Sequence, residues 1–154
     1  MSEELTTVII FLTANIMAGF EHSRGDRTVM WFPKVASVAI EIGDLMYSTG
    51  SGTVQLADAT SGDHVGVSQR AIASTDSTTD PIPLILCNDS TFFRVETASA
   101  VAADILGFVD LTDENTVNRG ATAKEVIFIT KFISATEVEV CVSAHAFSRR
   151  IATT

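Results

Sequence analysis

The 154-residue chain carries 10 Lys and Arg against 19 Asp and Glu, which gives a formal net charge of −9 and an isoelectric point near 4.6. An acidic surface of this kind repels phosphate backbones, so we expect no nucleic acid among the partners. The composition, 46% hydrophobic and 19% charged, excludes a disordered chain. It predicts one well-packed domain whose surplus apolar surface meets a partner or another subunit.

The N-terminal segment differs in composition from the rest of the chain. Two glutamates precede an apolar run, Val8 to Leu12, which is far shorter than the ~20 apolar residues needed to span a bilayer. The acidic start is also unlike a secretory signal, so we expect synthesis in the cytoplasm and no membrane partner. A polar cluster over 21–26 follows the apolar stretch. We therefore divide the chain into residues 1–26, which form an N-terminal arm or an ordinary first strand, and a domain over 27–154.

Short strands joined by tight turns make up most of the chain. Glycines and small polar residues mark the turns, as in the hairpin loop TGSGT at 49–53, and residues 75–81 form a longer polar loop. Pro33 cannot donate a ladder hydrogen bond and therefore marks an edge or a turn. We expect strands, in chain order, within residues 28–32, 35–42, 45–48, 54–60, 61–74, 83–88, 92–98 and 108–113.

Only one segment favours a helix. Ser99 is placed to cap the run AVAADIL and Gly107 to end it, which leaves a helix of about two turns at most. Residues 114–124 are then a loop with some strand tendency. About nine strands and one short helix, with connections mostly of hairpin length, predict an all-β fold. We expect a small β-barrel or β-tulip-like domain with an N-terminal arm or strand.

Residues 125–143 form the pattern of a β-hairpin that closes this domain. The first arm alternates β-branched and aromatic residues on both faces, so we expect a strand that is buried on both sides. The second arm places three valines on one face and Glu137, Glu139 and Cys141 on the other. This alternation predicts that the second arm is partly exposed, with those three residues facing solvent or a neighbour.

Histidines and acidic residues form no recognisable catalytic or metal motif. A catalytic triad would draw its base from His22, His64 or His145, and no GxSxG elbow surrounds a serine. We interpret His64 and His145 as surface or strand-end residues. The histidines are too widely spaced for a local metal site, and the acidic stretch 110–115 lacks the spacing of a calcium loop. We therefore expect no enzymatic activity, no catalytic residue, no metal and no cofactor.

Two further features have a structural interpretation. Cys87 and Cys141 lack CxxC spacing, and free buried thiols are the favoured state, with a disulfide between them as the open alternative. The glycines of 49–53 precede no lysine and open no helix, so they are not arranged to hold a phosphate.

Two adjacent aromatic pairs, Trp31-Phe32 and Phe92-Phe93, bear on the contact surface. Neighbouring residues of a strand point to opposite sides, so one member of each pair is available to face outward. Sugar-binding modules expose such rings but prefer Trp and Tyr, which are scarce in this chain. Core packing or a subunit contact is therefore the favoured role of these rings.

Two stretches of the sequence resemble the small capsid decoration, or cement, proteins of tailed bacteriophages. The first is IEIGDLMYSTGSGTVQLADATSGDHVGVSQRAI at 40–72, which is similar to that family's Gly-Asp strand, hairpin and V-G-V strand. The second is ADILGFVDLTDENTVN at 103–118, leading to EVIFITKFISATEVEV at 125–140. This part is similar to the family's helical turn, VDLTD strand and terminal hairpin.

The resemblance implies a structural virion protein that binds the outer surface of an icosahedral shell and stabilises it. The resemblance implies that the partner is the major capsid protein and that the protein lies on the capsid exterior. It also implies a homo-oligomer, with a trimer favoured. We expect residues 1–34 to supply much of the shell or subunit contact, with the anchors Arg24, Arg27, Trp31 and Phe32. Two other functions stay open: a receptor- or glycan-binding β-module of a virion, and a small enzyme whose site is built from distant loops.

Overall fold

The structure is a computed structural model that describes residues 19–147. Regular structure within these residues consists of eleven strands and one 3₁₀ helix of three residues, which confirms the all-β fold class. Most of the expected N-terminal arm, residues 1–18, lies outside the described residues. No helix in the described part is long and apolar enough to cross a membrane.

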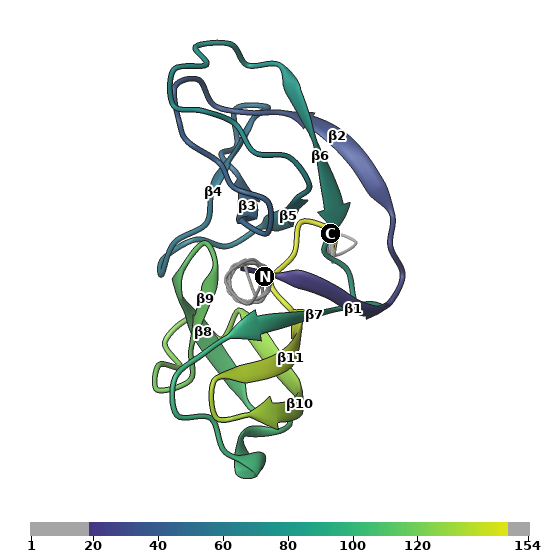
Figure 1. The fold of residues 1–154 in the computed structure, drawn as a ribbon, viewed down its shortest axis with the longest axis vertical. Helices are drawn as coiled ribbons and strands as arrows, with labels where there is room; N and C mark the ends of the chain where they lie inside the picture. The colour runs from purple at the N-terminus through teal and green to yellow at the C-terminus, as the bar shows by residue number, and fades with distance from the viewer. Residues whose placement is uncertain (1–18, 148–154) are drawn as a thin grey trace, which may run out of the picture.

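A six-stranded sheet forms the lower half of the molecule in Figure 1. Five of its strands, β7, β11, β10, β8 and β9, close into a barrel because Glu96 at the end of β7 pairs in parallel with Thr116 of β9. The remaining strand, β1, pairs with the other side of β7. The six strands are β1 (Glu21–Gly25), β7 (Thr91–Glu96), β8 (Phe108–Asp113), β9 (Thr116–Asn118), β10 (Ile127–Ser134) and β11 (Glu137–Val142).

A five-stranded sheet forms the upper half, in the order β2-β6-β5-β3-β4. Strand β2 lies at one end of this order, which confirms that Pro33 ends an edge strand. Lys34, the next residue, makes an isolated parallel bridge to Val54 of β4, so the sheet curls back on itself there. The five strands are β2 (Val29–Pro33), β3 (Leu45–Ser48), β4 (Val54–Leu56), β5 (His64–Ser68) and β6 (Pro81–Leu86).

Two clusters of buried apolar side chains hold the sheets together. The larger cluster fills the barrel and extends into the upper sheet through Leu45, Val67 and Ile85. The smaller cluster lies within the upper sheet, around Met46, and Phe32 of β2 packs against it. Because the larger cluster takes residues from both sheets, the two halves share one core.

Two predicted elements differ from the structure. Segment 35–42 is not a strand; it contains turns, and only Ile40 makes a bridge, to Ile72. Ile40 is nevertheless fully buried, so the apolar alternation reflects packing of an irregular segment. The helix is a single 3₁₀ turn, Ala102–Asp104, which follows Val101 and is not capped by Ser99.

The hairpin over 125–143 is present, but its burial is the reverse of the prediction. Strand β11 is buried at every position after Glu137, whereas β10 alternates buried and half-buried residues before its more exposed end. Glu139 is 3% exposed and Cys141 8% exposed. The prediction was wrong because β11 lies between β7 and β10 and side chains of β1 reach across to Glu139.

Candidate functional site: an exposed edge strand

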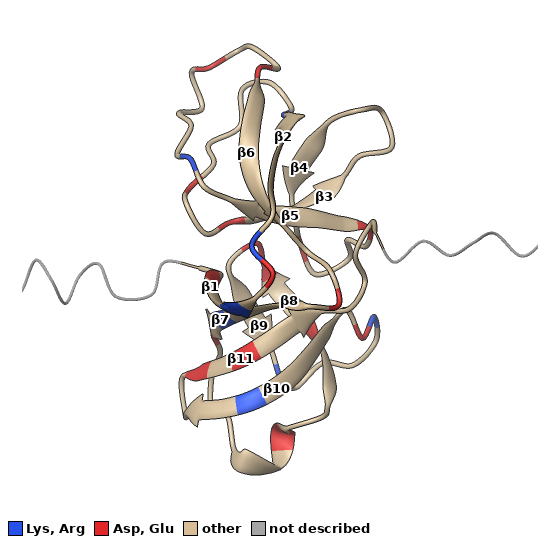
Figure 2. Ribbon diagram, turned by 90° about the vertical axis from the view of Figure 1, so that its right-hand side faces the viewer, with Lys and Arg blue, Asp and Glu red and all other residues tan. Residues whose placement is uncertain are grey.

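The largest apolar exposure on any strand of the described residues is on β2. Val29 is 39% exposed, Met30 46% and Trp31 58%. Figure 2 shows that no charged residue interrupts this strand along its length. Edge strands of soluble proteins usually carry charges or bulges that keep other chains from pairing with them. An uncharged edge with an exposed tryptophan is therefore the candidate contact surface.

Hydrogen bonding leaves one side of β2 open. The amide of Leu86 in β6 donates to the carbonyl of Thr28 at 2.9 Å. Main-chain groups of an antiparallel pair alternate in direction, so those of every second residue from Thr28 onward face β6. Those of Val29 and Trp31 face the opposite way, and no residue in the described part of the chain pairs with them. This side of β2 presents free donors and acceptors.

The four expected anchors divide into two groups. Trp31 is exposed, whereas Phe32, its neighbour, is half-buried against the smaller core. Arg27 lies exposed just before β2, and its Nη2 reaches Oε1 of Gln69 at 3.4 Å. The structure thus places Trp31 and Arg27 on or beside the open edge, while Phe32 anchors β2 from beneath.

Arg24 belongs to a different environment, on the barrel. Its Nε donates to Oε1 of Glu139 at 3.0 Å, and its guanidinium lies 4.0 Å from the ring centroid of Phe92. Burial raises the pKa of Glu139, but hydrogen bonds from Arg24, Ser23 and Thr130 outweigh it, so the net pKa is lowered. Arg24 therefore holds β1 against the barrel as the partner of a buried carboxylate.

His64 and His145 are buried, at 0% and 3% exposure, so neither is a surface residue; of the two positions that the sequence suggested, surface or strand end, His64 has the second, because it begins β5. Nδ1 of His64 lies 3.0 Å from the carbonyl oxygen of Ala144; because a carbonyl only accepts, Nδ1 carries the proton. Nε2 is then an acceptor, and it shares the single proton of the Ser61 hydroxyl, 3.0 Å away, with the carbonyl oxygen of Asp58. Burial lowers the pKa of His64 to about 4, so its ring is neutral near pH 7.

This Ser61–His64 contact has the spacing of a nucleophile and its base. Both side chains are buried, however, and the main chain of His64 pairs with Ala144 and Ala146. The arrangement joins the C-terminal end of the described chain to β5. Sequence reasoning missed it because His64 and His145 are brought together by a bridge between distant segments.

Other reactive or metal-binding groups are dispersed. Cys87 and Cys141 are buried free thiols, as the sequence favoured. Burial raises the pKa of Cys141 to about 11 and that of Cys87 still further, which keeps both protonated near pH 7. Among residues 19–147, no three His, Cys, Asp or Glu side chains form a group that would hold a metal ion.

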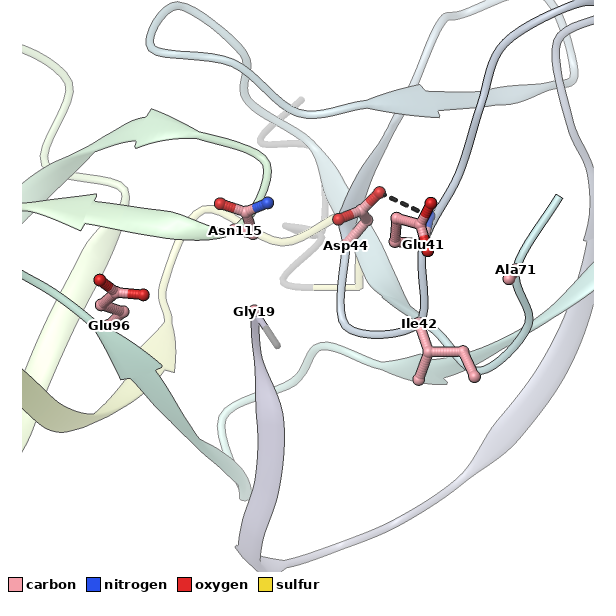
Figure 3. Close-up of a pocket in the computed structure, with 7 residues that line it drawn as sticks. All are labelled: Gly19, Glu41, Ile42, Asp44, Ala71, Glu96 and Asn115. Carbon is pink, nitrogen blue, oxygen red and sulfur yellow. Dashed lines mark hydrogen bonds between the residues drawn. The ribbon is translucent and has the colours of Figure 1, made fainter. Parts of the chain in front are cut away.

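A pocket of about 330 Å³ lies where the two sheets meet (Figure 3). Its lining includes Glu41, Asp44, Glu96 and Asn115, and the amide of Glu41 donates to Oδ2 of Asp44 at 2.8 Å. Burial of Asp44, with the nearby carboxylates of Glu114 and Glu41, raises its pKa to about 6. This pocket is acidic, and its buried carboxylate already serves the turn over 41–44.

A second pocket of about 330 Å³ lies on the barrel, and its surface is mainly apolar. Phe92, Phe108 and Phe128 line it, and the last two rings lie 4.8 Å apart between centroids. Phe108 is 43% exposed. The carboxylate of Asp89 at the rim is bonded to Nε2 of His145 at 2.8 Å. Such a pocket suits a small apolar group with few polar contacts.

Comparison with known proteins leaves the site to be judged on its own geometry. No protein-family model matches the chain, and no curated protein matches it in sequence. Within the described residues, the β2 edge combines exposed apolar side chains with unpaired main-chain groups. Sequence reasoning identified its central residue, Trp31, and its end, Pro33, but missed Val29 and Met30, because their exposure depends on the pairing of β2 with β6 alone.

Proposed function

We propose that this protein is a structural virion protein that binds the outer surface of an icosahedral capsid and stabilises it. The observation that supports this most is the exposed, uncharged strand β2 on an otherwise well-packed β fold. The sequence resemblance to decoration proteins of tailed bacteriophages points in the same direction. The partner is the major capsid protein, and the side chains of Val29 and Trp31 are the contact.

A decoration protein needs a rigid body and a contact face, and the physical features of this chain suit both needs. The shared core ties the two sheets into one unit that transmits load between the contact and the rest of the molecule. Many copies on one shell allow a modest contact to hold firmly, because each copy adds to the same lattice. A homotrimer on the capsid exterior fits this arrangement.

Co-sedimentation with shells tests the proposal. Purified protein is mixed with expanded capsids from which this protein has been omitted, and the bound fraction is measured for the natural chain and for Trp31→Ala. We expect saturable binding that Trp31→Ala weakens by about 10-fold or more, as for a central aromatic anchor. Phe108→Ala is the matched control, since Phe108 is an exposed aromatic residue on the barrel. Absence of saturable binding by the natural chain contradicts the proposal.

A receptor- or glycan-binding module is the second candidate, and the aromatic pocket on the barrel favours it. Three phenylalanine rings beside the Asp89 carboxylate give a small platform with one polar edge. Saturable binding on a glycan array that is lost in Phe108→Ala and retained in Trp31→Ala would support this candidate over capsid decoration.

A further inference from the structure

The open edge of β2 has a matching segment in the same sequence. The run Val8 to Leu12 contains five consecutive apolar residues, three of them β-branched, and no charge. Strand β2 also has five residues and no charge. Neither segment carries the lysines or acidic residues that discourage strand pairing. We propose that residues 8–12 of one copy add as a strand to the open edge of β2 in a second copy.

The main chain of β2 has unpaired hydrogen-bonding groups at which a strand can add. Val29 and Trp31 direct their amide and carbonyl groups away from β6, so an added strand gains paired hydrogen bonds without breaking any present in the sheet. The side chains of these residues stay on the face of the sheet. A shell contact through Trp31 and a strand at the edge of β2 are therefore compatible.

The chain outside the structure has the length that this contact needs. Eighteen residues precede Gly19, and residues 13–18 connect the apolar run to it. Six residues span at most about 21 Å when extended, which sets how far from Gly19 the apolar run can reach. Gly19 itself is packed between Gly43 and Asn115, so the connection leaves from a fixed point between the two sheets (Figure 3).

Docking onto a second copy produces an oligomer of this chain. The arm and the β2 edge are different surfaces, so the contact is heterologous, and it forms a ring where the rotation between copies closes. The contact does not involve a capsid. Its failure would leave the shell-binding proposal standing, and failure of shell binding would leave this contact testable in the purified chain.

Hydrogen exchange of the full chain tests the proposal directly. We expect the amides of Val29 and Trp31 to exchange on the order of 100-fold more slowly in concentrated than in dilute solution, because the added strand covers them only in the oligomer. The amides of Met30 and Phe32, which face β6, are the internal control and change little. The mass in solution should exceed the 16.4 kDa of a single chain.

Two matched substitutions separate main-chain pairing from side-chain contact. Trp31→Pro removes an amide that the fold does not use and should give a monomer, whereas Trp31→Ala keeps the amide and should keep the oligomer. Ile9→Asp with Ile10→Asp should also give a monomer that remains folded. Fast exchange at Val29 and Trp31 at every concentration overturns the proposal, and so does protection that persists in a monomer, which would place the arm on its own chain.

Discussion

At the scale of single residues, two neighbours in the sequence can differ completely in burial, because burial depends on what each side chain packs against. Trp31 and Phe32 are adjacent, yet one is exposed and the other packs against a core. This alternation was predictable from strand geometry. The burial of His64 and Glu139 was not, because both depend on partners far along the chain, Ala144 and Arg24.

The raised pKa of Asp44 predicts a dependence of stability on pH. The folded protein disfavours the ionised carboxylate, so the contribution of Asp44 to the free energy of unfolding is fully present below pH 3.8 and is lost as pH rises through about 6. Asp44→Asn keeps an acceptor for the Glu41 amide without the charge. We expect it to raise the free energy of unfolding at pH 7.5 by about 2 kcal/mol, measured by urea denaturation, and to change it little at pH 3.5.

Asp58→Asn is the control of opposite sign. Hydrogen bonds from Thr60 lower the pKa of Asp58, so its stabilising contribution is present at neutral pH and is lost in acid. The substitution should therefore lower stability at pH 7.5. An Asp44→Asn variant that is less stable than the natural chain at pH 7.5 would contradict the account of Asp44.

The two arginines of the predicted contact should differ in their effect on stability. Arg24→Ala leaves the nearly buried carboxylate of Glu139 without its cation, and we expect it to lower the free energy of unfolding by about 2 kcal/mol. Arg27→Ala removes only an exposed side chain and should stay within about 0.5 kcal/mol of the natural chain. Chemical denaturation of both variants measures the difference, and equal effects would show that Arg24 does not hold β1.

At the scale of elements, turn chemistry predicted more than apolar alternation did. The turn residues TGSGT correctly located the hairpin of β3 and β4, and the V-G-V pattern correctly located β5. Gly66 of that pattern is required because a Cβ there would lie 2.4 Å from the carbonyl oxygen of Ile85. Alternation failed for 35–42, because an irregular segment also buries apolar residues. Apolar alternation also gave the wrong burial for β11, because the side chain of Arg24 pairs with Glu139 and covers the polar face of that strand.

Substitutions in β2 should separate the stability of the fold from binding to the shell. Phe32→Ala removes a ring packed against the smaller core and should lower the free energy of unfolding by roughly 2 kcal/mol. Trp31→Ala removes a mainly exposed ring and should change it by less than about 0.5 kcal/mol while weakening shell binding. Denaturation and co-sedimentation of the same two samples measure both quantities. A large loss of stability in Trp31→Ala would mean that this ring is structural.

At the scale of the whole molecule, the fold class followed from strand count and loop length, but the arrangement of two sheets did not. The closing pairs are non-local: β1 with β7, and β7 with β9. A single sequence holds no signal for such pairings. The site was only partly predictable for the same reason, since the open side of β2 follows from its place at the end of a sheet.

The shared core predicts that the two sheets unfold together. Leu45, Val67 and Ile85 of the upper sheet are part of the same cluster as the barrel interior. We expect a single cooperative transition, with amide signals of β5 and β10 lost at the same urea concentration in NMR spectra. Separate midpoints for the two strands would mean that the halves are independent domains.

Cryo-electron microscopy of the phage particles that we propose carry this protein tests the central proposal most directly. The account predicts density for this two-sheet β fold on the outer surface of the capsid, repeated with the symmetry of the shell, with Trp31 and β2 at the contact. A capsid exterior without this density, or the fold found only on a tail or receptor-binding structure, would contradict it.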